Sequence, residues 1–325
     1  MGAEALVRVL RSGVEESVHL GHVAVCDADG RLIASAGDPS QLVFARSCMK
    51  PLQTAVSLAA IGDIRLSDRE IAIMSSSHNA EPIHLGAVRA LLKRAGLGPS
   101  ALRTPPAWPL DKQEMARAQH RNPQFHDCSG KHAGMLLACV RAGWDPSTYL
   151  RASHPLQRRV LRAVVRGTGT DDVAMGVDGC GVPVHGVPLA SMATLYARLA
   201  DAERMGPLAE QTDLAVEAML AEPYLVGGRD RDDTALMQAT GDVMAKEGAE
   251  ALDCAVSLSS GLGVAVKIAD GGFRAAGPAL LHTLAQLDAL DGRQLADLAG
   301  RLRPPVLGGG QPVGNLEPAF VLRRR

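Results

Sequence analysis

Residues 23–34 of the chain read Val-Ala-Val-Cys-Asp-Ala-Asp-Gly-Arg-Leu-Ile-Ala, which is two short apolar runs on either side of a turn. An Asp-Gly pair between such runs is typical of a β-hairpin, so this stretch predicts paired strands at Val23–Cys26 and Arg31–Ala34. The surrounding residues, 1–36, alternate apolar and polar side chains as a half-buried sheet does. Strand-like runs return towards the other end of the chain, at Ala249–Ser259 and Val264–Ala269, before a final helical region at Pro278–Leu302.

The middle of the chain, from about residue 51 to about residue 236, has mostly helical periodicity. Ser67-Asp68-Arg69-Glu70 is a capping box that predicts the start of a short helix. Apolar positions at three-to-four spacing predict further helices at Pro82–Ala95, Gly130–Ala142, Pro155–Arg166, Leu189–Asp201 and Leu208–Leu220.

Strands at both ends and helices between them predict an α+β fold, in which the two ends build one antiparallel sheet flanked by helices. We expect residues 1–325 to form a single catalytic unit of two packed lobes. The sheet lobe would comprise about 1–60 plus 240–325, and the mainly helical lobe about 61–239. A cleft between two such lobes is a common place for a functional site.

The composition excludes several classes of function. The chain has 325 residues, of which 46% are hydrophobic and 21% charged, and its formal net charge is −1. Because there is no basic surplus, we expect no binding to nucleic acid and none to a membrane surface. The sequence has no apolar stretch of the roughly 20 residues that a membrane span needs and no signal-peptide core, so we expect a cytoplasmic protein. Its six cysteines are too widely spread for a disulfide framework.

Lysine is rare in this chain, which uses arginine for most of its 34 basic positions. An amine can lose its proton and act as a base or a ligand, whereas a guanidinium group cannot. Each of the few lysines in this arginine-rich chain is therefore a candidate catalytic base or metal ligand. The six lysines are Lys50, Lys93, Lys112, Lys131, Lys246 and Lys267.

Three short motifs indicate a serine nucleophile. Ser47-Cys48-Met49-Lys50 is an S-x-x-K sequence before a helical run, so Ser47 and Lys50 are expected one turn apart, with the helix N-terminus favouring negative charge. Ser77-His78-Asn79 is an S-x-N sequence, and Lys246-Glu247-Gly248 is a K-x-G sequence. Penicillin-binding proteins and class A β-lactamases combine motifs of these three kinds. Each motif is degenerate, so chance agreement remains open, and Lys267 is a rival to Lys246.

Two cysteines next to glycines indicate a metal site. Cys128 lies in Cys-Ser-Gly-Lys-His and Cys180 in Asp-Gly-Cys-Gly, and two thiolates presented by turns suit zinc. Two cysteines are too few for a structural zinc site, so a third ligand is needed; ordinary ligand preferences favour a histidine. Two thiols without a metal are an equally open alternative. The candidates for the third ligand are Lys131, His126, His132 and Asp178.

These blocks together resemble the zinc-binding, rhizobial-type L-asparaginases, and the resemblance spans nearly the whole chain. It is carried by Ser47–Pro51, Ser77–Pro82, His126–His132, Asp178–Gly181 and Ala245–Glu250. The resemblance implies a fold related to serine β-lactamases, penicillin-binding proteins and bacterial glutaminases. It also implies hydrolysis of L-asparagine to L-aspartate and ammonia by a homodimer.

Carried over residue by residue, the resemblance implies one serine–lysine tandem of Ser47 with Lys50 and a second of Ser77 with Lys246. It further implies one zinc ion per chain, held by Cys128, Lys131 and Cys180, with His132 and Asp178 around it near the substrate. Arg46 is the expected anchor for a substrate carboxylate, because arginine pairs with carboxylates through two parallel hydrogen bonds. The chain departs from its relatives at Arg231–Thr234, where they can carry a further cysteine.

Two other functions remain possible from the sequence. A glutaminase or a penicillin-recognising acyl-enzyme would use the same serine–lysine chemistry and differ in pocket length. A non-catalytic, metal-stabilised binding protein would keep the fold without the chemistry. Both serine–lysine pairs are complete, which disfavours the second alternative.

Overall fold

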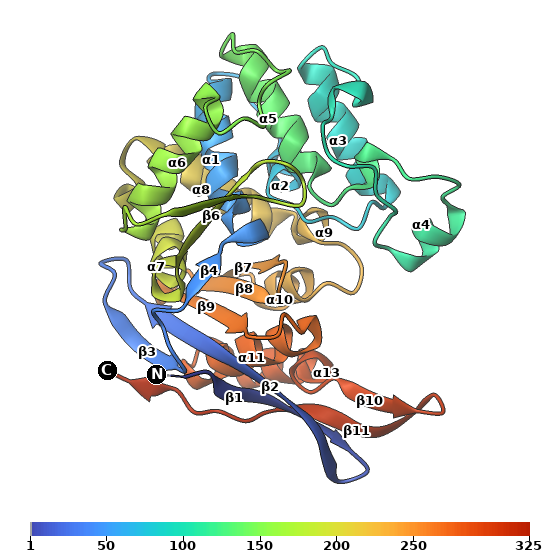
Figure 1. The fold of residues 1–325 in the computed structure, drawn as a ribbon, viewed down its shortest axis with the longest axis vertical. Helices are drawn as coiled ribbons and strands as arrows, with labels where there is room; N and C mark the ends of the chain where they lie inside the picture. The colour runs from blue at the N-terminus through green and yellow to red at the C-terminus, as the bar shows by residue number, and fades with distance from the viewer. Residues whose placement is uncertain (1) are drawn as a thin grey trace.

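The computed structural model describes residues 2–325, which form a large sheet with helices on both faces (Figure 1). The hairpin predicted at residues 23–34 is confirmed: β2 (Val14–Cys26) pairs with β3 (Leu32–Ala36). Asp27 closes the turn, because its Oδ1 accepts hydrogen bonds from the backbone N–H of Asp29 (3.0 Å) and of Arg31 (2.9 Å).

The large sheet is antiparallel throughout and is built from the two ends of the chain, as expected for the α+β fold. The strand order is β10-β11-β1-β2-β9-β8-β7. Gly21 of β2 pairs with Glu4 on one side and with Ile268 on the other, so β1 and β3 share one edge of β2 and β9 takes the opposite edge. The further strands are β1 (Glu4–Arg11), β7 (Val243–Gly248), β8 (Leu252–Ser257), β9 (Leu262–Ile268), β10 (Pro305–Gly308), β11 (Gln311–Pro318) and β12 (Arg323–Arg324).

The two faces of this sheet belong to two different cores. Ala24 and Cys26 of β2 pack with the helices of the middle of the chain. Val23 and Val25 point the other way and pack with the C-terminal helix α11 (Phe273–Gln286). Strand residues alternate between faces, so one apolar strand serves both cores.

The predicted helices are confirmed, with ends shifted by a few residues. They are α2 (Asp68–Met74), α3 (Pro82–Arg94), α5 (Ser129–Arg141), α6 (Pro155–Thr168), α7 (Leu189–Ala200) and α8 (Ala209–Ala221). The capping box of α2 is present, with Ser67 N–H donating to Glu70 at 2.9 Å. The other helices are α1 (Lys50–Ile61), α4 (Lys112–Arg117), α9 (Pro223–Val226), α10 (Asp232–Thr240), α12 (Gly292–Asp297) and α13 (Ala299–Leu302).

A second, three-stranded sheet consists of β4 (Leu42–Phe44), β5 (Ala174–Val177) and β6 (Pro183–Pro188). It takes two of its strands, β5 and β6, from the middle of the chain, where the sequence predicted mainly helix. Each is short, and β5 and β6 are rich in glycine or proline, so they carry little of the alternation that reveals a strand.

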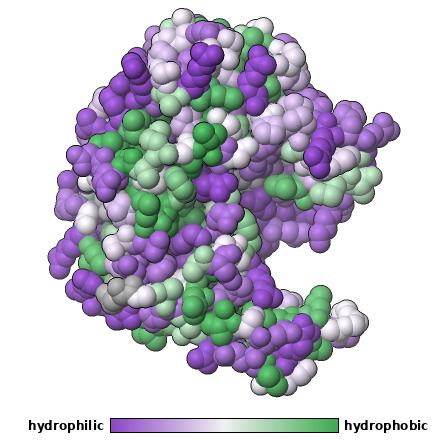
Figure 2. Space-filling model, in the orientation of Figure 1, coloured by the Kyte–Doolittle hydropathy of each residue, from purple (hydrophilic) through white to green (hydrophobic). Residues whose placement is uncertain are grey.

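Helix α7 lies on the large sheet, although its residues fall within the range expected for the helical lobe (Figure 1). Gly263 of β9 faces this helix, and a side chain there would collide with the backbone carbonyl of Ala193. The division into lobes near residues 60 and 240 stays a prediction. Figure 2 shows that the molecule is hollowed between its helical part and the projecting β10–β11 arm. Across residues 2–325, every helix is too short or too polar to cross a membrane.

Candidate active site

Ser47 lies in a short 3-10 turn, Arg46–Met49, that leads directly into α1. The residue before it, Arg46, has a φ of +46°, a conformation that an L-residue adopts only under local strain. Cys48 fixes the turn against the sheet, because its Sγ lies 3.2 Å from the Lys246 carbonyl oxygen and 3.0 Å from that of Leu252. The turn therefore holds the Ser47 hydroxyl in one place at the edge of the large sheet.

The K-x-G motif has a structural reason for its glycine. Gly248 of β7 packs against the Ser47 turn, and a Cβ atom there would lie 2.9 Å from Cys48 Sγ. That distance is shorter than carbon and sulfur tolerate, so a side chain would push the turn off the sheet. Because Gly248 has no side chain, the Ser47 turn can pack closely against β7.

Lys50 reaches Ser77 across the site. Its Nζ donates to Ser77 Oγ at 2.8 Å and to the Ser76 carbonyl oxygen at 2.6 Å, and its side chain is fully buried. Ser77 is fixed in turn by its own backbone, whose N–H donates to Val226 O at 2.8 Å. Arg231 Nη1 donates to the Ser77 carbonyl oxygen at 2.9 Å.

Ser47 and Ser77 line one cavity of about 580 Å³, part of which is open to solvent. Within residues 2–325, the Ser47 hydroxyl makes no hydrogen bond. Two half-exposed apolar side chains, Leu110 and Phe273, also line it. The remaining lining residues are Asp127, Arg231, Glu247, Gly248 and Ala249.

Lys246 is not brought to Ser77. Its fully buried Nζ donates to Asp233 Oδ2 at 3.0 Å and to the Glu247 carbonyl oxygen at 2.9 Å. Burial alone would raise the pKa of Asp233, but the charges of Lys246 and Arg231 hold it below its usual value. The structure thus pairs Ser77 with Lys50, and the expected tandem of Ser77 with Lys246 stays a prediction.

The three expected metal ligands do come together. Cys128 and Lys131 lie at the start of α5, where a spacing of three residues places both on one face. Cys180 comes from the β5–β6 hairpin, in a turn closed by Gly181 N–H donating to Asp178 O at 2.8 Å. Lys131 Nζ lies 3.2 Å from Cys180 Sγ.

The charge state of this cluster follows from its contacts. A hydrogen bond from the Cys128 thiol lowers the pKa of Cys180 to about 6 against the effect of burial, and the charge of Lys131 adds to the lowering. Burial disfavours charge on Lys131, but the two sulfurs and Asp178 raise its pKa overall. Lys131 and Cys180 therefore each favour the charged form of the other.

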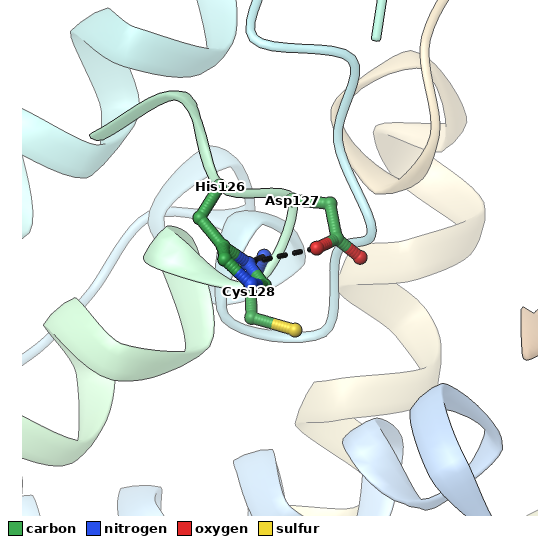
Figure 3. Close-up of side chains that lie close together, drawn as sticks. All are labelled: His126, Asp127 and Cys128. Carbon is green, nitrogen blue, oxygen red and sulfur yellow. Dashed lines mark hydrogen bonds and ion pairs between the residues drawn. The ribbon is translucent and has the colours of Figure 1, made fainter. Parts of the chain in front are cut away.

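The donor set fits zinc. Nitrogen and sulfur bonded to tetrahedral zinc at about 2.0 and 2.3 Å lie about 3.5 Å apart, close to the separation of Lys131 Nζ and Cys180 Sγ. His126, Asp127 and Cys128 also lie close enough together to hold a metal ion, although His126 Nδ1 is 2.8 Å from Asp127 Oδ1 and 3.2 Å from the Cys128 backbone N–H (Figure 3).

The residues expected around the metal and the substrate lie next to the cluster. Arg46 Nε donates to Asp178 Oδ1 at 2.8 Å, so the expected carboxylate anchor is paired with another expected site residue. His132 is fully buried, with Nδ1 2.7 Å from the Tyr149 hydroxyl. Its Nε2 has no hydrogen-bond partner within residues 2–325.

The sequence matches the family model of L-asparaginase II over residues 7–318. The chain belongs to the L-asparaginase II family. The resemblance noted from the motifs is confirmed at this level, and L-asparaginase II membership makes the protein a hydrolase acting on amides. The zinc ion that the resemblance implied is a separate question.

Solved structures provide a second comparison for this L-asparaginase II family member. A β-lactamase from Mycobacterium bovis is 15% identical, with 86% of this chain and 94% of that chain covered and a TM-score of 0.43. A Bacillus subtilis glutaminase, in covalent complex with 5-oxo-L-norleucine, is 16% identical, with 84% and 89% covered and a TM-score of 0.38. A sequence search finds no match among curated proteins.

Three residues of this site received no role from the sequence. Asp127 and Glu247 stand inside the motifs but have no spacing rule of their own, and Arg231 was noted only as a departure from the relatives. Each is identified by its place on the cavity wall. Asp127 lies directly before Cys128, which is the one local signal for it.

Proposed function

We propose that this L-asparaginase II family member hydrolyses L-asparagine to L-aspartate and ammonia. The observation that carries the proposal is that Ser47 and Ser77 face one cavity, with Lys50 Nζ 2.8 Å from Ser77 Oγ. A hydroxyl next to an amine is the arrangement that acyl transfer from an amide requires.

In the proposed mechanism, Ser47 is the nucleophile. Its Oγ adds to the carbon of the side-chain amide, and Lys50 Nζ takes up its proton. When the C–N bond breaks, the Ser77–Lys50 pair delivers a proton to the departing nitrogen, which leaves as ammonia. Water then cleaves the ester on Ser47 and releases L-aspartate. Lys246 is the fourth catalytic group. To act on Ser77, its ammonium group has to leave Asp233 and bond to Ser77 instead.

The strained Arg46 and the start of α1 support Ser47 as the acylated residue, because both fix a hydroxyl where a helix N-terminus favours negative charge. Intact-mass measurement after brief mixing with asparagine tests this. Ser47→Ala should form no covalent adduct, whereas Ser77→Ala should turn over at least about 100-fold more slowly and still allow an acyl-enzyme to be trapped. An adduct on Ser77 in Ser47→Ala would reverse the assignment.

Substrate choice is tested by ammonia release from asparagine and glutamine, with a chromogenic β-lactam as a third compound. We expect the specificity constant for asparagine to exceed that for glutamine by at least about 100-fold. A single methylene accounts for about 10- to 200-fold, so this ratio needs the longer amide to be displaced from Ser47. Comparable rates for both amides would favour the glutaminase alternative, and β-lactam hydrolysis the penicillin-recognising one.

We further propose that Cys128, Lys131 and Cys180 hold one zinc ion per chain, with Asp178 and His132 nearby. A zinc ion with three protein ligands polarises a carbonyl group or a bound water. Elemental analysis should find about one zinc per chain, and the Cys128→Ser, Cys180→Ser double variant should lose it. Lys131→Met and His126→Gln separate two of the four candidate third ligands, because only the first should release the metal.

The homodimer implied by the resemblance is also a proposal. The chain has a mass of 34.0 kDa, so size-exclusion chromatography with light scattering should give twice this mass if the dimer forms in solution. A single-chain mass at micromolar concentration would contradict it.

A further inference from the structure

The cavity that contains Ser47 and Ser77 has two carboxylates in its wall, Glu247 and Asp127. Both oxygens of Glu247 are already used. Its Oε2 accepts from Arg231 Nε at 2.9 Å and lies 2.8 Å from Arg231 Nη2. Its Oε1 accepts from the backbone N–H groups of Asp232 (2.6 Å) and Asp233 (3.0 Å). Glu247 is therefore neutralised by Arg231 and has little capacity left for a ligand.

Asp127 also has cationic neighbours, His126 and Lys50, but unlike Glu247 it keeps one oxygen without a hydrogen bond. One oxygen, Oδ1, lies 2.8 Å from His126 Nδ1. The other, Oδ2, lies 3.8 Å from Lys50 Nζ, which is too far for a hydrogen bond, and it accepts none within residues 2–325. The side chain is 28% exposed, and it borders the same cavity as the two serines. An ionised carboxylate only accepts hydrogen bonds, so Oδ2 is a free acceptor next to the reacting groups.

We propose that Asp127 binds the α-ammonium group of the substrate. This inference rests on the proposed function, because it takes the substrate to be an amide of a free amino acid. Such a substrate has an ammonium group with three N–H donors, and a charge-assisted hydrogen bond to a carboxylate is stronger than a neutral one. Asparagine and glutamine both carry this group, so Asp127 selects for a free α-amino group and does not choose between them.

Asp127 has a rival role, which is to position Lys50 through the 3.8 Å ion pair. The two roles predict different kinetics. Loss of an ammonium-binding residue weakens only substrates that have the ammonium group, mainly through KM. Loss of a partner of Lys50 lowers kcat for every amide alike.

The test compares asparagine with succinamic acid, which is the same molecule with hydrogen in place of the ammonium group. The native enzyme should prefer asparagine by about 10- to 100-fold in kcat/KM, the usual scale for a hydrogen bond to a charged group. In Asp127→Asn this preference should fall close to one, mainly because KM for asparagine rises. Asp127→Glu, which keeps the charge, should retain part of the preference. Asp171→Asn, a change at an exposed carboxylate elsewhere on the surface, should leave it unchanged.

An equal loss of kcat on both compounds, with their ratio preserved, would overturn the proposal in favour of the Lys50 role. Melting temperatures of the three variants show whether each is folded. If the native enzyme prefers glutamine, the proposed asparaginase function is wrong, and the same ratio is measured with glutamine and glutaramic acid. If none of the four amides releases ammonia, both proposals fail.

Discussion

At the scale of single residues, the ion pair between Lys246 and Asp233 is the clearest case of a group serving the fold while belonging to a catalytic motif. Both side chains are almost fully buried, and their atoms are 3.0 Å apart. Removing one partner of a buried ion pair leaves the other uncompensated, at a cost of about 3–5 kcal/mol. We therefore expect Lys246→Met to lower the free energy of unfolding in urea by about that amount.

Adding Asp233→Asn to Lys246→Met should recover more than half of the lost stability, since the amide needs no counter-charge. If Lys246 also moves protons, this stabilised double variant should still turn over at least about 100-fold more slowly than the native enzyme. Lys267→Met is the matched control. The Lys267 ammonium donates to the Glu250 and Ile268 carbonyls outside the cavity, so its loss should leave kcat unchanged. Native-like turnover by the double variant would remove Lys246 from the mechanism.

The sequence predicted which residues lie near one another better than it predicted which of their atoms form hydrogen bonds. Ser47 and Ser77 line one cavity, but Lys50 bonds to Ser77, which the sequence had paired with Lys246. Cys128, Lys131 and Cys180 meet as well. The partner of Lys246 could not be predicted, because a lysine on a strand faces whichever buried carboxylate the packing brings near it. Only the fold places Asp233 of α10 there.

At the scale of elements, the N-terminus of α3 depends on a neutral histidine. Glu81 N–H donates to His84 Nδ1 at 3.2 Å, and His84 Nε2 lies 2.9 Å from the Tyr224 carbonyl oxygen. Burial lowers the pKa of His84, although the Tyr224 carbonyl opposes this shift. The unfolded chain, with a histidine pKa near about 6.5, therefore binds a proton before the folded chain does.

The sign of the effect follows from this difference. Above about pH 6.5 both states are neutral, and below it the unfolded state gains protons first, so stability falls as the pH falls. The free energy of unfolding should drop with a slope of at most about 1.4 kcal/mol per pH unit from this residue between pH 6.5 and 5. His84→Gln should make the drop shallower in urea titrations at several pH values. An unchanged slope would show that His84 is not the group responsible.

Elements with strong local signals were predicted well, and elements stabilised by their neighbours were not. The helices from α2 to α8, apart from α4, have caps or apolar stripes that the sequence shows directly. Strands β10, β11 and β12 were missed, because β10 and β12 are short and all three have few buried side chains to show an alternating pattern. Their pairing with β1 and β3 comes from the fold rather than from their own side-chain pattern.

At the scale of the whole molecule, the C-terminal segment closes the core beneath the sheet. Phe320 is 4% exposed and packs edge-on against His282 of α11, while the next residue, Val321, is 75% exposed. Phe320→Ala should lower the free energy of unfolding by about 3–5 kcal/mol, as for other buried aromatic residues. Val321→Ala should change it by no more than about 0.5 kcal/mol. Similar losses from both variants would mean that this segment is not docked in solution.

The pairing of β2 with β9 also delays completion of the sheet while the chain is being synthesised. Val25 and Val266 face the same core but lie about 240 residues apart, which a ribosome covers in about 12–50 s at about 5–20 residues per second. Throughout that interval the hairpin at residues 23–34 has an open, apolar edge that only the last quarter of the protein can occupy. A strand made early thus waits for a partner made late, and we expect a nascent chain of this enzyme to need shielding from its neighbours until β9 emerges.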